Sequence, residues 1–334
     1  MNVLLVNHYP EHQHEILSQV IEELKKLNGG HRYRLVYDLK PRLKHFLWAI
    51  GQPTRVVSMY QLRAFRPHWA TVWTQRKLTK SQEYQVLDEY GITIPKWTTL
   101  TRDKMPDLSG FSDFVVTKPD WGCCGALIRV RKQSRLKWEK PVVEKAGESI
   151  SDDWIVQEYI HTDRWPTSYR VGTVFGEPIY AWHHVGNKSV QPFERKPEKA
   201  SDFAGRTIVA SARGCTYDLE IPEDILELAR NTHAAFPTVP LLGVDIVRDC
   251  DTKKLYVLDI NTSGNTFHLT SDTGKDIMGQ FGLDLLGQFG GAKAIARGIA
   301  KRVEKEATEL VPKTTVEEEP TDCLRTKSEG ALSR

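Results

Sequence analysis

The chain has 334 residues, of which 40% are hydrophobic and 27% are charged. This composition is typical of a folded globular protein, and a length above 300 residues predicts more than one packed lobe. The longest apolar runs span only four or five residues, far fewer than the ~20 that a membrane helix needs, so we expect no membrane span. The sequence shows neither a secretory signal nor the cysteine pattern of a disulfide framework, which predicts a reduced, cytoplasmic protein.

Basic residues are concentrated in two stretches, although the net charge is only +3. Residues 31–77 contain ten Lys or Arg against one acid, and residues 128–140 contain six against one. Such stretches are typical either of solvated faces or of surfaces that meet an acidic partner, nucleotide phosphates included. They carry neither an aromatic RNA-binding signature nor zinc-finger spacing, so we do not expect nucleic acid as a partner.

The first ninety residues alternate between strand and helix patterns. A buried-strand run at 3–6 precedes a helix with apolar residues from Ile16 to Leu27, and a second strand follows at 33–37. Strand, helix and strand in this order open an α/β layer. A further helix is expected from Ser81 to Tyr90, before Gly91.

The middle of the chain is rich in strand patterns. Gly176-Glu-Pro178 indicates a hairpin turn, and Pro222 begins a helix that extends to about Phe236. After about Glu309 the chain has few large apolar residues, which predicts a solvated tail. The expected strands are 114–118, 127–130, 154–159, 169–175, 179–183, 243–248 and 255–260.

Two short patterns suggest chemistry but are better explained as structure. The string His8-Tyr-Pro-Glu-His12 is spelled like a zinc-peptidase motif, which needs both histidines on one helix, but Pro10 interrupts it. Cys123 and Cys124 are adjacent and lack the C-x-x-C spacing of redox pairs. Neither G-x-G-x-x-G nor the Walker A motif occurs, so those two phosphate-binding loops are excluded.

A different phosphate-binding pattern lies at 115–126, where a strand ends in Lys118 and a glycine loop leads to another strand. Lys118 would place a fixed positive charge near phosphate oxygens, and Gly122 and Gly125 would let loop N–H groups donate at close range. Hairpin loops often contain two glycines as well, so this pattern alone does not establish a nucleotide site.

Three oxygen-bearing side chains lie on two neighbouring predicted strands further along the chain. Asp259 and Asn261 are two residues apart and therefore point to the same face of one strand, where Asp245 of the adjacent strand can join them. Two carboxylates and an amide oxygen are hard ligands that suit Mg²⁺ shared with phosphates. Each residue alone would be read as a strand-end hydrogen bond, whereas the three in this register favour a metal site.

The glycine loop, the three oxygen-bearing side chains and the segments described next occur in the same order as in the ATP-grasp superfamily. The chain resembles that superfamily from about Lys77 to Ile299. Arg76-Lys77-Leu78 and the helix after it are similar to the family's entry segment, and Ile155–Ile160 is similar to the hinge that holds adenine. Ser168–Val171 with the Gly176 turn is similar to the family's Arg-bearing hairpin. The resemblance implies nucleotide contacts from Lys77, Lys118, Gly122, Gly125, Gln157, Glu158, Tyr159, Ile160 and Asp163, and metal contacts from Asp245, Asp259 and Asn261.

The chain departs from the family's pattern in three places. The last metal acid is usually Glu and is Asp259 here, and the Pro-Gly pair that often follows is replaced by Thr262-Ser-Gly-Asn-Thr266. Some relatives place an arginine where this chain has Gly243. The resemblance therefore implies that another arginine stabilises the transferring charge. The candidates, each otherwise read as part of a surface ion pair, are Arg170 first, then Arg213 and Arg206.

The resemblance implies an α/β fold of ATP-grasp type that follows a Rossmann-like N-terminal domain. It also implies that ATP, with Mg²⁺ or Mn²⁺, drives amide formation between a carboxylate and an amine of an amino acid or peptide, through an acyl phosphate. A homodimer is the commonest soluble assembly. The expected divisions are an N-terminal domain at 1–75, a subdomain with the nucleotide lysines at 76–160, a subdomain with the metal site at 161–308 and a tail at 309–334.

Two other functions stay open. A kinase on the same fold would make a stable phosphate ester, and it is favoured if the basic stretches 31–77 and 128–140 line the acceptor cleft. A non-catalytic nucleotide-binding module is disfavoured by the complete set of lysines, acids and asparagine. An amide product against a phosphorylated product separates the first two functions.

Overall fold

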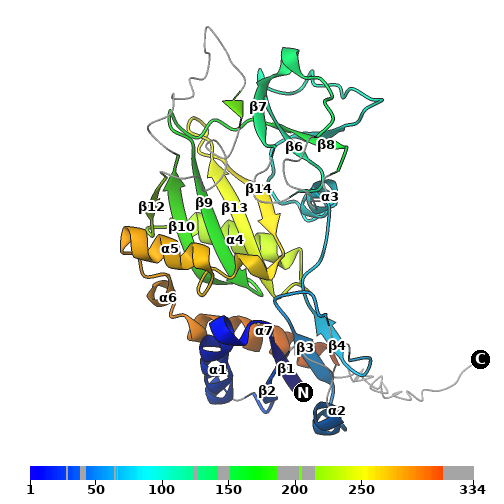
Figure 1. Ribbon diagram of the computed structural model, residues 1–334, viewed down its shortest axis with the longest axis vertical. Coiled ribbons are helices and arrows are strands. Elements are labelled where there is room, and N and C mark those ends of the chain that lie inside the picture. The colour runs from blue at the N-terminus through cyan, green and yellow to red at the C-terminus, as the bar shows by residue number, and fades with distance from the viewer. Residues whose placement is uncertain are drawn as a thin grey trace, which may run out of the picture.

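The structure is a computed structural model. Within the part of the chain that it describes, the strands form three sheets with helices packed around them (Figure 1), which confirms the mixed α/β class expected from the sequence. The described residues are 1–27, 29–37, 43–63, 65, 67–122, 127–141, 151–186, 203–204 and 215–310.

The first sheet, here called the β1 sheet, is parallel and has the strand order β2-β1-β3-β4. Its central strand β1 is buried along its whole length, because helices cover both faces of a parallel sheet. This explains the apolar run at the start of the sequence. The elements are β1 (Asn2–Asn7), α1 (Pro10–Leu27), β2 (Arg32–Tyr37), α2 (Leu43–Ala49), β3 (Thr54–Val57) and β4 (Thr71–Trp73).

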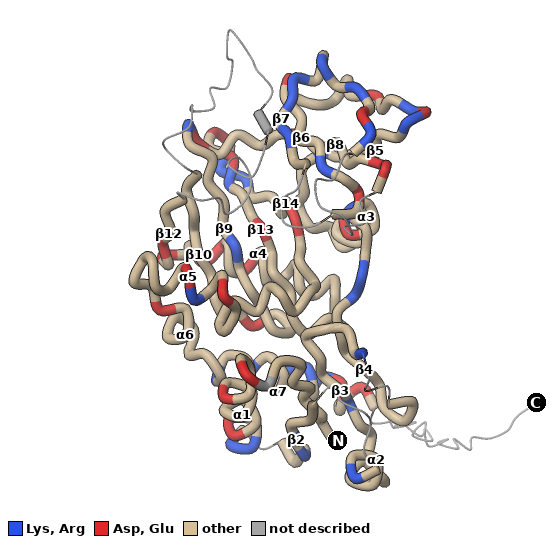
Figure 2. Tube along the Cα trace, in the orientation of Figure 1, with Lys and Arg blue, Asp and Glu red and all other residues tan. Residues whose placement is uncertain are grey.

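The basic stretch 31–77 lies on this sheet. Arg32 and Arg34 of β2 hold their guanidinium groups 4.7 and 4.8 Å from the centre of the Trp48 ring in α2. Figure 2 shows basic positions on β2 and α2, and the described residues of this stretch include no acid.

The second sheet, the β6 sheet, has the order β11-β7-β6-β8-β5, and its described pairings are antiparallel. Strand β6 shows the period of two: Val115 packs with Trp154 in one apolar cluster, whereas Val116 belongs to a cluster on the other face. Lys118 shares the face of Val116. The strands are β5 (Trp97–Leu100), β6 (Phe114–Pro119), β7 (Arg129–Lys132), β8 (Trp154–Glu158) and β11 (Phe203–Ala204).

The third sheet, the β9 sheet, is antiparallel with the order β12-β10-β9-β13-β14. The expected hairpin joins β9 and β10, and its turn residues Phe175 and Gly176 have φ angles of 47° and 86°. Helix α4 packs against this sheet. The elements are β9 (Thr167–Val174), β10 (Glu177–Val185), β12 (Thr216–Asp218), α4 (Glu223–Ala234), β13 (Leu241–Arg248), β14 (Leu255–Asn261), α5 (Asp272–Phe281) and α6 (Leu285–Gln288).

The last described helix, α7 (Ala292–Leu310), returns to the β1 sheet and lies beside α1 (Figure 1). One apolar core contains Leu24 of α1 and Ile299 of α7 together with Trp182 of β10. The β1 sheet and the β9 sheet therefore share a core across the expected division at residue 75, and the exact division into domains stays a prediction. The tail expected after about Glu309 lies, from residue 311, outside the described residues.

Helix α3 (Lys80–Glu89) lies between the β6 and β9 sheets (Figure 1). Thr79 caps the helix, and its hydroxyl accepts from the Gln82 N–H while the Gln82 side chain accepts from the Thr79 N–H. Tyr84 of α3 packs in the same core as Ile155 of β8 and Val257 of β14. Among the described residues, no helix combines the length and the apolar character that a bilayer crossing requires.

Candidate functional site

A pocket opens between the β6 sheet and the β9 sheet. Its empty space, part of it open to solvent, is about 480 Å³. Both sheets and the segment after β8 contribute to its wall. The lining residues are Val116, Lys118, Ile128, Gln157, Glu158, Tyr159, Ile160, Thr162, Pro166, Thr167, Ser168, Val247 and Leu258.

The segment at the end of β8 forms one side of this pocket. Of the predicted adenine hinge, Ile155–Ile160, the last four residues line the pocket. The backbone there is held in place, because the Glu158 N–H donates to the Lys96 carbonyl at 2.8 Å. Asp163, an expected nucleotide contact, is exposed next to the lining residue Thr162 and accepts from the Arg164 N–H at 2.6 Å.

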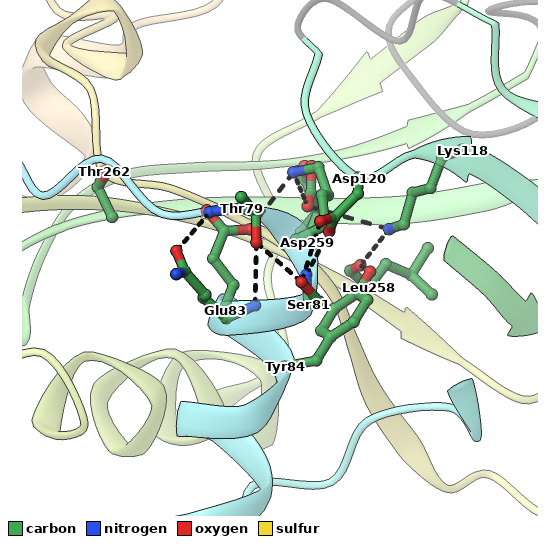
Figure 3. Close-up of polar contacts among 12 residues, drawn as sticks. Thr79, Ser81, Glu83, Tyr84, Lys118, Asp120, Leu258, Asp259 and Thr262 are labelled. Atoms are coloured by element: carbon green, nitrogen blue, oxygen red, sulfur yellow. Dashed lines mark hydrogen bonds and ion pairs between the residues drawn. The ribbon is translucent and has the colours of Figure 1, made fainter. Parts of the chain in front are cut away.

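Lys118 is a buried cation in the pocket wall, with 5% of its surface exposed. Its ammonium donates to the Leu258 carbonyl at 2.9 Å and lies 5.0 Å from the centre of the Tyr84 ring (Figure 3). Its nearest carboxylate oxygen, Oδ1 of Asp259, is 4.0 Å away. Burial lowers the pKa of Lys118 to about 8, although the charge of Asp259 opposes this shift. A buried ammonium with this little compensation favours an anion in the pocket.

An irregularity in β14 provides the carbonyl that Lys118 binds. Asp245 of β13 pairs with Asp259, but the next residue, Ile246, pairs with Val257, so Leu258 is an extra residue in the ladder. The Leu258 carbonyl accepts from Lys118 and also from the Tyr84 hydroxyl, at 2.7 Å. This bulge connects the two sheets at the pocket.

A row of charged side chains crosses three neighbouring strands of the β9 sheet. Asp245 of β13 lies directly opposite Arg170 of β9 on one side and Asp259 of β14 on the other. Arg170 binds Asp245 with two parallel bonds, from Nε to Oδ1 and from Nη2 to Oδ2, the latter at 2.7 Å. Burial raises the pKa of Asp245 even though Arg170 lowers it. Asn261 lies opposite Gly243, two residues along the same face.

Helix α3 adds a second lysine to this row. Lys80, its first residue, binds Oδ1 of Asp259 and lies 3.4 Å from Oε2 of Glu83. The helix start is fixed to the end of β6, because the Ser81 N–H donates to Oδ1 of Asp120 at 2.7 Å. This anchor directs Lys80 toward β14.

The pKa values of the two carboxyl groups beside Lys80 are shifted in opposite directions. Burial raises the pKa of Asp259, but Lys80 and Lys118 outweigh it, so this pKa lies below its ordinary value. Burial raises the pKa of Glu83 to about 7, although Lys80 opposes the shift. Burial also lowers the pKa of Lys80, and the two carboxylates outweigh it and raise this pKa above its ordinary value. Lys80 is therefore a permanent cation at neutral pH.

The expected metal ligands fit a hard divalent cation. Asp245, Asp259 and Asn261 share one face of the sheet and offer only carboxylate and amide oxygens, which Mg²⁺ prefers. The amide of Asn261 is not fully used, since its Nδ2 is buried without a hydrogen-bond partner among the described residues. Among the described residues, no group of three or more His, Cys, Asp or Glu side chains is arranged to hold a metal.

Other expected site residues are placed less centrally. Lys77 is exposed on the loop before α3, and Gly122 is exposed just after β6. Gly125, Arg206 and Arg213 lie outside the described residues, as do Cys123 and Cys124.

Three residues of α3 contact the site but were not predicted from the sequence: Lys80, Glu83 and Tyr84. A signal for Lys80 was present, because Thr79 and Gln82 form the spacing of a capping box and so place Lys80 in the first turn of a helix. Glu83 and Tyr84 gave no comparable signal. Their burial depends on how α3 packs between two sheets.

Comparison with known proteins finds similarity at the level of solved structures. No family model and no curated protein matches the sequence. D-alanine–D-alanine ligase from Bacillus anthracis is 13% identical over 91% of this chain and 99% of its own, with a TM-score of 0.42. D-cycloserine synthetase DcsG is 15% identical over 91% and 100%, with a TM-score of 0.45. ATP-grasp ligase PsnB, in complex with a minimal precursor, is 14% identical over 90% and 98%, with a TM-score of 0.45.

Of these three structures, that of PsnB is described as an ATP-grasp ligase. At identities of 15% or less and TM-scores below 0.5, the similarity does not transfer a reaction or a substrate to this chain.

Proposed function

We propose that the chain is an ATP-dependent ligase that joins a carboxylate to an amine. The observation that carries this proposal is that Lys118, in the wall of the pocket, lies 4.0 Å from Asp259. Asp259 follows the lining residue Leu258 and is the end of the row that continues through Asp245 to Arg170. A buried lysine and a row of hard oxygen ligands together are the parts that phosphoryl transfer needs.

ATP would lie with its base against residues 157–160 and its phosphates toward Lys118. The hinge segment lines the pocket together with apolar side chains, among them Val116 and Leu258 of the two sheets. Lys118 and Lys80 would pair with phosphate oxygens, since both cations form ion pairs with the same carboxylate, that of Asp259. Lys77 and Asp163 stay predictions as nucleotide contacts.

Asp245, Asp259 and Asn261 would hold Mg²⁺ in the loaded site. The ion would neutralise phosphate charge there. The other charges that the reaction needs come from side chains of the protein. Arg170 is fixed by two bonds to Asp245, so its charge stays at one place beside the carboxylates while the reaction proceeds.

The reaction would proceed in two steps. An oxygen of the substrate carboxylate attacks the γ-phosphorus, the bond to the bridging oxygen of ADP breaks, and an acyl phosphate forms. An amine then attacks the acyl carbon, inorganic phosphate leaves and the nitrogen loses a proton. Arg170 would stabilise the negative charge that develops on the transferring phosphoryl group and then on the tetrahedral oxygen.

The test is ADP release by the purified full-length chain with ATP and Mg²⁺, on pools of amino acids and acidic peptides, with mass spectrometry of the products. We expect ADP, free phosphate and a product lighter than its two substrates by one water. Lys118→Ala and the double variant Asp259→Ala/Asn261→Ala should lose turnover. A substrate heavier by one phosphoryl group, without free phosphate, would establish a kinase instead.

A further inference from the structure

The acidic side chains of the charged row beside the pocket are already paired with cations of the same chain. Asp259 is bound by Lys80, and both carboxylate oxygens of Asp245 are bound by Arg170. With Glu83 and Lys118 included, the cluster contains three carboxyl groups and three cations. Its formal charge is therefore zero when Glu83 is ionised, and positive when Glu83 is protonated.

This balance opposes the binding of a divalent cation by itself. An ion at the face shared by Asp245, Asp259 and Asn261 would meet the positive charges of Lys80 and Arg170, which are in direct contact with its ligands. In a partly buried site this repulsion is weakly screened. Nucleotide phosphates change the balance, because they bring negative charge with which Lys80 can pair instead of Asp259.

We propose that Lys80 and Arg170 are built-in counter-ions that make metal binding at Asp245, Asp259 and Asn261 dependent on bound nucleotide. The inference rests on the proposed nucleotide site. Without phosphates, Lys80 holds Oδ1 of Asp259; with phosphates, Lys80 moves to them and releases that oxygen for the metal. Lys80 is a positioning residue here, whose role is to order the arrival of the ligands.

Lys80 is the better of the two residues to test. The Lys80 side chain is 17% exposed. A substitution of Lys80 still leaves the Lys118 ammonium 4.0 Å from Asp259. Loss of Arg170 would leave Asp245 without any bonded cation. Lys25 provides a matched control. It pairs with Glu22 at 2.7 Å, three residues away as Glu83 is from Lys80, but on the exposed face of α1.

The experiment measures Mn²⁺ binding to the full-length protein by electron paramagnetic resonance, without nucleotide and with a saturating non-hydrolysable ATP analogue. We expect the wild-type protein to bind Mn²⁺ at least ~10-fold more tightly with the analogue. Lys80→Met should raise the nucleotide-free affinity on the order of tenfold, since it removes a positive charge that is in direct contact with the ligand Asp259. Lys25→Met should change nothing, and Asp259→Asn added to Lys80→Met should abolish the gain.

Two results would overturn the inference. One is an equal Mn²⁺ affinity of the wild-type protein with and without the bound analogue, a measurement that needs no variant. The other is an unchanged or weaker nucleotide-free affinity in a Lys80→Met protein whose circular dichroism matches the wild type. Either result leaves the ligase proposal standing if turnover is observed, whereas failure of the analogue to bind would remove both.

Discussion

The β9 sheet and the β6 sheet position their charged side chains near the pocket by different means. On the β9 sheet, Arg170, Asp245 and Asp259 stand in one row because strand pairing sets them opposite one another. On the β6 sheet, a single side chain, Lys118, reaches across to the β14 bulge. The first arrangement is a property of the backbone register, and the second depends on one rotamer and its few contacts.

The difference extends to the cores behind each wall. The β9 sheet rests on a core that includes α4, the three inner strands β10, β9 and β13, and residues of α3. Behind the β6 wall, the described residues form two smaller clusters. We infer that substitutions in the row reduce stability in addition to their effect on function, whereas substitution of Lys118 mainly affects binding.

Loss of Arg170 should have the largest effect. Arg170→Met leaves Asp245 partly buried without its bidentate partner, so we expect the free energy of unfolding to fall by about 3 kcal/mol. Urea denaturation measures this change. The matched control is Arg297→Met, since Arg297 is 43% exposed and pairs with Glu177 at 2.8 Å, and its loss should cost less than about 1 kcal/mol. Equal losses in the two variants would contradict the idea that the row is a structural element.

Loss of Lys118 should mainly weaken nucleotide binding. Lys118→Met removes a buried cation from the pocket wall, and a charge-assisted bond to phosphate is worth about 1.5–3 kcal/mol, or ~10–100-fold in affinity. Isothermal titration with a non-hydrolysable ATP analogue measures it. Lys104, an exposed lysine between β5 and β6, provides the control variant Lys104→Met. An unchanged affinity in Lys118→Met would remove this lysine from the nucleotide site.

The binding of nucleotide should also depend on pH through Lys118. Burial lowers its pKa to about 8 in the free protein, so the group is charged below that pH and becomes neutral as the pH rises through it. Phosphates favour the charged form, and we therefore expect affinity to fall ~10-fold from pH 7 to pH 9. Titrations across this range should show the fall in the wild type and a flat profile in Lys118→Met. An affinity that rises with pH would have the wrong sign for this mechanism.

The contact between the walls through Tyr84 should give the smallest effect. Tyr84→Phe removes the hydroxyl that donates to the Leu258 carbonyl, and we expect a loss of about 1 kcal/mol in the free energy of unfolding. The loss is limited because that carbonyl still accepts from Lys118. Tyr90→Phe, at the exposed end of α3, is the control and should be neutral. A loss of several kcal/mol in Tyr84→Phe would show that the bulge depends on this one bond.

Much of the cleft could be predicted from the sequence, because it depends on local periodicity. The two-residue spacing of Asp259 and Asn261 fixes a common face on any extended strand, and the structure has both on one face of β14. The strand that ends near Lys118 and the segment 157–160 were likewise located by their patterns, and both line the pocket. These are short-range properties of the chain.

The tertiary structure alone decided which residues meet. Lys77 and Lys80 are three residues apart in one basic segment, and only the anchor between Ser81 and Asp120 directs Lys80 to Asp259. The sequence ranked Arg170 as a catalytic candidate but gave no sign of its pairing with Asp245, which follows from the order of strands in the sheet. Helix α7 joins the core of α1 although some 270 residues separate the two. Periodicity specifies the face on which a side chain lies, whereas its neighbours are set by contacts between segments distant in the sequence, which no local pattern encodes.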